Sequence, residues 1–531
     1  MSAQSEQMLP QPVHFIGIVG AGMSGIAAAL AELGVRVTGS DLKNSRYIRH
    51  VADAGVPVNI GHREENLGDA ALVVVSSAIP ESNSELRAAR LKGVPVLQRA
   101  EMLARLMAMR RGIAVAGTHG KTTTSSMISH VLHCCGRDPS FMVGGEVNDI
   151  GSNARMGQGE WLVAEADESD GSLLFLRPEA AIVTNVELDH HSYYRSLDEV
   201  HDVFRRFVAM LPPHGLLALV EDSGGEFLAA ETPARVVVCG IERGGAEGAG
   251  ESPAAAVTST PTPPAPASTP TPSTPAPTPE SPTPASTAAL RATIVALVDC
   301  GSEFLVHNGA GELLGRVELR LPGEHNVLNA LCAIAALEYA GVPLAEATPH
   351  LATFSGAARR FQETGRYNDV VVFDDYAHHP TEIAATLRAA KNGSYGRVIA
   401  VFQPHLYSRT RYLQREFGCA LTLADEAIVT DIFPAREEPE PGVTGKLVVD
   451  AYLAERPGGP VAYMPRVGDV VRHLSQRVRG GDLVLTLGAG DIFRAGEQLL
   501  AVLERGEREE DGPSDEAGSS DEAGSSAEVA G

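Results

Sequence analysis

The feature that most constrains this fold is a repeated pattern: a short run of β-branched and apolar residues ends in Gly, Asp or Asn, and a helix-like segment follows. The runs that we predict as strands are residues 13–19, 35–40, 72–77, 113–116, 161–166, 181–186, 370–373, 398–402, 427–430 and 483–487. Strands that alternate with helices in this way build parallel α/β sheets. Such sheets bind ligands at the carboxyl ends of their strands, so the segments after the strands are the candidate site.

A glycine-rich segment follows the first predicted strand. It contains Gly20-x-Gly22-x-x-Gly25 at the start of a predicted helix. Glycines at this spacing allow a tight turn and let backbone N–H groups approach a diphosphate at the helix N-terminus. Asp41 ends the next strand, where a ribose hydroxyl would be met. Alone, the pattern favours a nicotinamide or flavin enzyme, although another nucleotide diphosphate fits the same loop and close packing would also explain the glycines.

A second glycine-rich segment follows the strand at 113–116. It reads Gly117-Thr118-His119-Gly120-Lys121-Thr122-Thr123. Its mechanism is that of a phosphate loop, because backbone N–H groups and Lys121 would hold the β- and γ-phosphates of ATP while Thr122 binds Mg²⁺. Val115 stands where the general pattern has its first glycine, so this is the GTxGKTT variant. A dehydrogenase needs no second loop, whereas an ATP-driven ligase acting on a nucleotide-linked substrate needs both.

Acidic side chains follow the next two predicted strands. The first group is EADESD, beginning at Glu165, and the second is NVELDHH, beginning at Asn185. Carboxylates so close together repel one another unless cations compensate. Mg²⁺ takes oxygen ligands, few from protein and the rest from water and phosphate. A solvated acidic loop would explain either group alone, but two groups at successive strand ends favour a site that faces ATP.

Histidine, tyrosine and arginine follow strands in the last third of the chain. The segments are DDYAHHP, beginning at Asp374, and QPHLYSR, beginning at Gln403. Consecutive histidines suggest zinc, but no cysteine or acid spacing supports such a site, and adjacent side chains point apart. These residues at strand ends suggest a mouth that binds carboxylate and phosphate.

The bulk properties exclude several classes of protein. The formal net charge of −24 argues against a nucleic-acid partner. No run of about 18 apolar residues predicts a membrane span, and the opening segment lacks the pattern of a secretory signal. We therefore expect a cytoplasmic protein with reduced thiols. The cysteines are Cys134, Cys135, Cys239, Cys300, Cys332 and Cys419.

Composition also divides the chain. A chain of 531 residues is long enough for about three or four domains. Residues 244–289 are rich in Pro, Thr, Ala and Ser and predict a surface insertion, and the acidic stretch 506–531 predicts a disordered tail. We place the domains at residues 1–109, 110–321 and 322–505.

Motifs along nearly the whole chain resemble the Mur ligase family, in the family's order, and favour its alanine-adding members. They are HFIGIVGAGMSGIA, SSAI, GTHGKTTT, EADESDGS, TNVELDHH, LPGEHNVLNA, RRFQ, DDYAHHPTEI, FQPHLYSRT and GAGDI. The resemblance implies a three-domain α/β architecture, with a Rossmann-like N-terminal domain that binds UDP, a central P-loop ATPase domain and an α/β C-terminal domain. It also implies cytoplasmic, ATP- and Mg²⁺-dependent ligation of L-alanine to the carboxylate of UDP-N-acetylmuramate through an acyl phosphate, in peptidoglycan precursor synthesis.

The resemblance assigns roles residue by residue. It implies that ATP is bound by the phosphate loop Gly117–Thr123 with His325, Asn326, Arg360 and Asp375. It implies that Mg²⁺ is bound by Thr122, Glu165 and His190. The UDP-sugar falls to His14, Gly20, Gly22, Asp41, His62, Ser76 and Arg99. The alanine falls to Tyr376, His378, His405 and Arg409. The catalytic set is Lys121, Glu165, His190, His378, His405 and Arg409, with either His378 or His405 as the base that deprotonates the alanine ammonium.

The chain departs from the family pattern in three places. Val19 replaces a glycine of the usual GIGGAGMSG, and the Pro-rich insertion is no part of the family core. Several members carry a carbamylated lysine near the metals, but this chain has no lysine between Lys121 and Lys391. Three alternatives stay open: a ligase that recycles muramyl tripeptide, a nicotinamide oxidoreductase, and a catalytically silent nucleotide-binding scaffold, which the acids and Lys121 disfavour.

Overall fold

The computed structural model describes residues 9–43, 47–76, 78–190, 193–242, 287–298, 301–435 and 437–510. The chain divides into two compact units, residues 1–360 with 388–394, and residues 361–387 with 395–531. Each unit is considered by itself below. The predicted insertion lies almost wholly outside the described residues, as do Cys300 and most of the predicted acidic tail.

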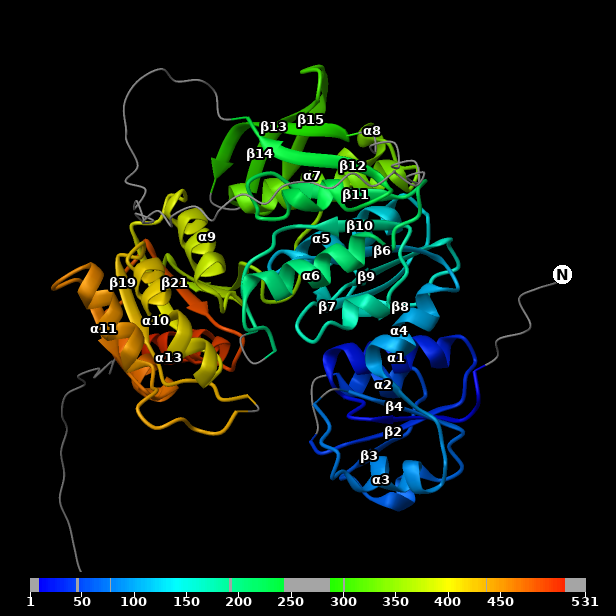
Figure 1. Cartoon of the computed structure of the whole chain (residues 1–531). Coiled ribbons are helices and arrows are strands. Elements are labelled where there is room, and N and C mark those ends of the chain that lie inside the picture. The colour runs from blue at the N-terminus through cyan, green and yellow to red at the C-terminus, as the bar shows by residue number, and fades with distance from the viewer. Residues whose placement is uncertain are drawn as a thin grey trace, which may run out of the picture. The chain divides into compact units, whose positions relative to one another are not determined.

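The first sheet, drawn in blue in Figure 1, is parallel and has the strand order β3-β2-β1-β4-β5. Its strands are β1 (Val13–Ile16), β2 (Val37–Asp41), β3 (Val58–Ile60), β4 (Leu72–Val75) and β5 (Val96–Gln98). The side chains of α1 (Ala21–Glu32), α2 (Ile48–Asp53) and α4 (Arg99–Met107) share a core with one face of this sheet. Those of α3 (Ser84–Leu91) and the 3₁₀ helix η1 (Glu64–Leu67) pack on the other.

The second sheet has ten strands, in the order β15-β14-β13-β12-β11-β10-β6-β9-β7-β8. Its parallel strands are β6 (Arg111–Ala116), β7 (Ser140–Val147), β9 (Trp161–Glu165), β10 (Ala180–Val183), β11 (Leu216–Val220), β12 (Arg235–Ile241) and β13 (Thr287–Val298). Antiparallel strands complete both edges: β8 (Ser152–Arg155) at one, β14 (Gly301–Asn308) and β15 (Leu313–Leu319) at the other.

Helices cover both faces of the second sheet. The helices α5 (Lys121–Cys134) and α7 (Glu324–Tyr339) share a core with one face, and α6 (Leu197–Val208) packs on the other. The α5 helix is almost entirely buried although its sequence is rich in Ser and Thr. Its Ser125 and Ser129 hydroxyls donate to carbonyls one turn earlier, which satisfies polar groups that burial would otherwise leave unpaired. The short helix α8 (Leu344–Leu351) follows α7.

The second unit contains a six-stranded sheet with the order β16-β17-β21-β18-β19-β20. Its strands are β16 (Gln362–Tyr367), β17 (Val370–Asp375), β18 (Arg397–Phe402), β19 (Glu426–Val429), β20 (Val461–Tyr463) and β21 (Asp482–Leu487), and only β16 is antiparallel. The helices that follow these strands are α9 (Pro380–Lys391), α10 (Tyr407–Leu421), α11 (Lys446–Glu455), α12 (Val467–Ser475) and α13 (Phe493–Glu510).

The three-sheet α/β architecture confirms the predicted fold class, and all ten predicted runs coincide with strands. Eleven of the 21 strands in the described residues were not among the predicted runs, including β13 to β15 at one end of the second sheet. The placement of α7 differs from our division at residue 321, because this helix packs on the second sheet and the units divide after Arg360. The helix α13 also continues to Glu510, past the predicted start of the tail. The domain limits themselves stay predictions.

Two bulk expectations concern membranes and thiols. The described part of the chain contains no helix with the length and hydrophobicity needed to cross a membrane. The five cysteines in the described residues form no disulfide with one another.

Candidate active site

The second glycine loop leads from β6 directly into the N-terminus of α5. Gly117 has φ +122° and Gly120 has φ +82°, conformations that side chains with a Cβ rarely adopt. A Cβ on Gly117 would lie 2.2 Å from Thr184 Oγ1, and one on Gly120 would lie 2.6 Å from Asn329 Oδ1. The first-turn N–H groups of α5 are thus presented by a loop that only glycine permits, an arrangement suited to phosphate.

Residues at the end of β10 hold this loop in place. The backbone N–H of His119 donates to Asn185 Oδ1 (2.9 Å), and that of Thr118 donates to the Asn185 carbonyl (3.1 Å). The Thr184 hydroxyl donates to the His119 carbonyl. The Glu187 N–H donates to Thr118 Oγ1 (2.9 Å). The segment NVELDHH therefore contacts the phosphate loop, and its predicted place facing ATP stays a prediction.

The Lys121 ammonium lies inside the loop. Its Nζ is 2.5 Å from the Gly117 carbonyl oxygen and 3.0 Å from that of Thr118, and it donates to both carboxylate oxygens of Glu168 at 2.9 and 3.1 Å. Burial alone would lower the pKa of Lys121, but the carboxylates of Glu168, Asp167 and Glu165 hold it above its usual value. Lys121 is therefore charged and would have to exchange Glu168 for phosphate oxygens.

Glu168 belongs to EADESD, but nothing in that segment distinguished it from the neighbouring acids. Its side chain is 3 % exposed, and His190 Nε2 lies 3.5 Å from its Oε1. Tyr194 donates its hydroxyl hydrogen to the backbone carbonyl of Glu168. The predicted residues Lys121 and His190 therefore meet at a carboxylate that only the folded chain identifies.

Thr122 and Glu165, two predicted Mg²⁺ ligands, both lie against the Gly144–Gly145 step of β7. The N–H of Gly144 donates to Glu165 Oε1 at 2.6 Å, and a Cβ on Gly144 would lie 2.7 Å from Glu165 Oε2. A Cβ on Gly145 would lie 3.2 Å from the Thr122 methyl group. The two glycines let the Glu165 carboxylate and the Thr122 side chain approach the β7 backbone beside the phosphate loop, and their oxygens are of the type that Mg²⁺ prefers.

The N-terminus of α7 lies next to the same loop. Asn326 donates to the Pro322 carbonyl (2.8 Å), and Asn329 donates to Asn326 Oδ1 at 3.4 Å. Because the Asn329 side chain contacts Gly120, the predicted adenosine contacts His325 and Asn326 lie one helical turn from the phosphate loop. Asn329 itself was not predicted.

The first glycine loop is held by β2, its neighbour in the first sheet. The N–H groups of residues 17 and 18 donate to the Ser40 carbonyl, and that of Val19 donates to Asp41 Oδ2 at 3.0 Å. The Val19 side chain, which replaces the family glycine, is buried in the core of the unit. Asp41 therefore braces the loop, and its predicted contact with a ribose stays a prediction.

Gly22 and Gly25 serve close packing. A Cβ on Gly22 would lie 3.3 Å from the Arg99 side chain, and one on Gly25 would lie 2.5 Å from Ala154 Cβ in β8. Arg99 also lies 3.6 Å from Asp167. Burial raises the pKa of Asp167, but the positive charges of Lys121 and Arg99 together lower it by more, so its pKa is below the usual value. Arg99 thus connects the first glycine loop to Asp167 of the acidic segment EADESD, which lies beside the second glycine loop.

Beneath the first loop, the α3 face of the sheet buries a polar network around Glu85. Its carboxylate accepts from the Ser40 hydroxyl, Asn66 Nδ2 (2.6 Å) and the Arg63 N–H (3.0 Å), and it lies 3.3 Å from His14 Nε2. Burial raises the pKa of Glu85, but these hydrogen bonds outweigh it and bring the pKa to about 2. His14, a predicted substrate contact, is fully buried here, and its contact with substrate stays a prediction.

Two more predicted UDP-sugar residues lie at the carboxyl edge of this sheet. His62 follows β3, and its Nδ1 is 3.0 Å from Ser40 Oγ. Ser76 follows β4, and its hydroxyl accepts from the N–H of Ala78 at 3.1 Å.

In the second unit, the predicted alanine-binding residues come together at the strand ends. The rings of Tyr376 and His378 are 5.3 Å apart, and those of His378 and His405 are 6.0 Å apart. Arg409 lies 3.2 Å from His405 Nδ1 and is buried. The His405 ring also stacks on Phe433, with centroids 5.9 Å apart.

Asp375 is also fixed at this edge. Its carboxylate accepts from the N–H groups of Ala377 (2.7 Å) and Phe361 (2.9 Å). The predicted mouth of His, Arg and Tyr side chains therefore has a rigid carboxylate beside it. Arg360 belongs to the other unit, and its pairing with Asp375 around a nucleotide stays a prediction.

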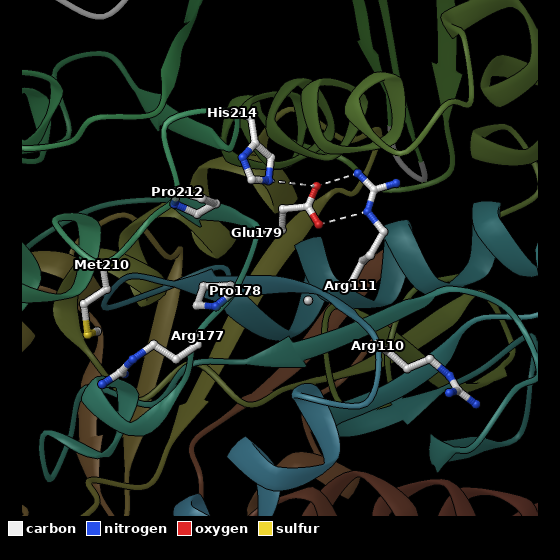
Figure 2. A pocket seen from close by; sticks show the side chains of 9 residues that line it. Arg110, Arg111, Arg177, Pro178, Glu179, Met210, Pro212 and His214 are labelled. Carbon is white, nitrogen blue, oxygen red and sulfur yellow. Dashed lines mark hydrogen bonds and ion pairs between the residues drawn. The ribbon is translucent and has the colours of Figure 1, made fainter. Parts of the chain in front are cut away.

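A separate cavity of about 350 Å³ lies at the amino ends of β6, β10 and β11, the opposite edge from the phosphate loop. Figure 2 shows Glu179 paired with Arg111 and with His214 there. The guanidinium groups of Arg110 and Arg177 point away from one another in this view, so they form no converging anion site.

Three family models match the chain. They are the Mur ligase family catalytic domain over residues 12–111, the Mur ligase middle domain over 115–253, and the Mur ligase glutamate ligase domain over 359–490.

Curated relatives match over almost their whole length. A UDP-N-acetylmuramate–L-alanine ligase of Rubrobacter xylanophilus is 47 % identical over 92 % of this chain and 100 % of its own. One of Pelotomaculum thermopropionicum is 43 % identical over 93 % and 98 %.

Solved structures agree with these matches. UDP-N-acetylmuramate–alanine ligase of Thermotoga maritima has a TM-score of 0.71 at 26 % identity and covers 93 % of this chain and 99 % of its own. A murein peptide ligase of Psychrobacter arcticus has a TM-score of 0.64 at 25 % identity, covering 92 % and 98 %.

Proposed function

Because this chain belongs to the Mur ligase family, we propose that it joins L-alanine to the carboxylate of UDP-N-acetylmuramate, with cleavage of ATP to ADP and phosphate. The observation that carries this proposal is the pair of glycine loops in one unit, linked through Arg99 and Asp167 and accompanied by a charged, buried Lys121. We place the reaction in the cytoplasm, in peptidoglycan precursor synthesis.

The first half-reaction would be phosphoryl transfer. A carboxylate oxygen of the muramoyl group attacks the γ-phosphorus of ATP, and the bond from this phosphorus to the β–γ bridging oxygen breaks. The products are ADP and an acyl phosphate. Lys121 and the N–H groups at the start of α5 would neutralise the charge on the transferred group. Thr122, Glu165 and His190 would hold Mg²⁺, which supplies further charge neutralisation when bound.

The second half-reaction would be attack of the alanine amine on the acyl carbon. A tetrahedral intermediate forms, phosphate leaves and the amide results. Arg409 would bind the alanine carboxylate, because its guanidinium is buried beside His405 at the strand ends. Tyr376 would complete this pocket.

The amine must lose a proton before it attacks, and the geometry favours His378 over His405 as the base. His378 Nδ1 lies 3.0 Å from the Tyr376 carbonyl oxygen, so it carries the hydrogen and leaves the lone pair on Nε2. His405 Nδ1 faces the Arg409 guanidinium, which can only donate, so this nitrogen is the acceptor and the ring hydrogen is on Nε2. Of the two rings, His378 therefore has its lone pair on Nε2, the nitrogen that we propose takes the proton.

The test is phosphate release from ATP and Mg²⁺ with UDP-N-acetylmuramate, in one arm with L-alanine and in another with muramyl tripeptide. We expect release that requires L-alanine. Release only with the tripeptide would move the assignment to the recycling reaction, and no release in either arm would favour a silent nucleotide-binding scaffold. A change in reduced-cofactor absorbance would indicate an oxidoreductase instead.

A further inference from the structure

The buried carboxylate of Glu85 has no part in the chemistry proposed above. It stands in the first turn of α3 and is fully buried. Its ion-pair partners among the described residues are two histidines, His14 and His62, at 3.3 and 3.5 Å. A buried charge that is bonded to so many donors restrains the positions of those donors. Two of the groups that it restrains are Ser40, which holds the first glycine loop, and His62, a residue of the predicted nucleotide-sugar site.

Ser40 connects this carboxylate to the first glycine loop. Its hydroxyl donates to Glu85, while its backbone carbonyl accepts from the N–H groups of Gly17 (2.8 Å) and Ile18 (3.0 Å). One residue of β2 therefore ties the position of the loop to the position of Glu85. A shift of the carboxylate would move the loop that is suited to a diphosphate.

His62 receives its orientation from the same pair of residues. Because the Ser40 hydroxyl gives its hydrogen to Glu85, the Ser40 oxygen accepts from Nδ1–H of His62, at 3.0 Å. The neutral ring then has its lone pair on Nε2. The His62 side chain is 9 % exposed, and its Nε2 is buried and has no hydrogen-bond partner among the described residues. An unpaired buried nitrogen is costly, and a ligand hydroxyl or N–H would satisfy it.

We propose that Glu85 is the positioning residue of the nucleotide-sugar site. Through Ser40 it fixes the first glycine loop and holds His62 with Nε2 as an acceptor for a hydroxyl or N–H group of the bound nucleoside diphosphate sugar. This inference rests on the proposed function for the class of ligand, and it adds a residue that does not itself touch the ligand.

The experiment compares Glu85→Gln, Ser40→Ala and His62→Ala in steady-state ligation. Each variant should raise the KM for UDP-N-acetylmuramate about tenfold, the typical effect of losing one hydrogen bond to a ligand, with kcat and the KM for ATP within twofold of the parent. The double variant Glu85→Gln/His62→Ala should raise the KM for UDP-N-acetylmuramate by less than the product of the two single effects, because Glu85 acts in part through His62.

The matched control is Glu179→Gln, at the cavity of Figure 2. This change also removes a carboxylate bonded to several donors, but at the opposite edge of the second sheet. It should leave both KM values unchanged. An unchanged KM for UDP-N-acetylmuramate in Ser40→Ala and Glu85→Gln would overturn the proposal, as would an equal rise in both KM values. If Glu85→Gln does not fold, Ser40→Ala decides, because it leaves Glu85 its bonds from Asn66 and the Arg63 N–H.

Calorimetric titration with UDP separates this inference from the proposed reaction. If the parent protein binds UDP but does not ligate alanine, the proposed function fails while weaker UDP binding by Glu85→Gln would still support the role of Glu85. If the parent ligates alanine and the variants bind UDP as tightly as the parent, the positioning role fails and the reaction stands.

Discussion

The charge on Glu85 should make the first sheet's stability depend on pH. Its pKa of about 2 lies below the ordinary value of 4.5, so the folded state favours the ionised form more than the unfolded state does. The resulting stability is fully present above pH 4.5 and is lost as the pH falls toward 2. This difference between the two pKa values corresponds to about 3 kcal/mol of folding stability at neutral pH.

The perturbation that isolates this contribution is Glu85→Gln, because glutamine has nearly the shape of a protonated glutamate. Amide hydrogen exchange would measure the opening free energy of β1, β2 and α3 in both proteins between pH 2.5 and 7, a range set by the two pKa values. We expect the variant to open more easily by about 3 kcal/mol at pH 7, with the difference shrinking as the pH falls. A difference that stays constant with pH would refute the reasoning. Glu81→Gln, an exposed partner of Arg90, should change nothing measurable.

Three further predictions test the site and its packing. Lys121→Ala should keep the fold and lower kcat by at least about 100-fold, measured as alanine-dependent phosphate release beside a circular dichroism spectrum. His378→Ala should lower kcat by about 100-fold or more and remove the acidic limb of the pH–rate profile, whereas a larger loss in His405→Ala would reverse our choice of base. Gly25→Ala should lower the thermal midpoint, at a cost of about 1–3 kcal/mol, because the new Cβ would lie 2.5 Å from Ala154, and Ala154→Gly should restore it.

The sequence predicted the architecture well because its signals are local. A β-branched run that ends in glycine or an acid carries its own evidence of a strand, and each glycine loop is read from adjacent residues. The same locality explains what was missed. Glu85 lies in a helix of mixed polarity, SELRAARL, and its burial depends on His14 and Ser40, which are 71 and 45 positions away. Glu168 and Asn329 likewise acquire their roles only through contacts made across the fold.

The strands β13 to β15, at one end of the second sheet, were missed for a different reason. The first of them begins at Thr287, inside the stretch 244–289 that was predicted as an insertion, so composition concealed its start. The hairpin strands beyond it pair antiparallel and have no helix between them, and therefore lack the alternation on which the ten predicted strands were recognised.

The two glycine loops are held in the same way, by a polar side chain at the end of a neighbouring strand. This changes the role that we assign to polar residues at strand ends. In the first loop Asp41 of β2 accepts from the Val19 N–H, and in the second Asn185 after β10 accepts from the His119 N–H. Each side chain lies at a strand end where the sequence suggested a ligand-binding site, and each accepts a hydrogen bond from a backbone N–H of the neighbouring loop. A glycine loop is flexible by composition, so its N–H groups can bind phosphate with little reorganisation only if other residues hold them in place. Polar residues at strand ends thus hold both glycine loops in place, and we expect Lys121 together with backbone N–H groups to make the direct contacts with phosphate.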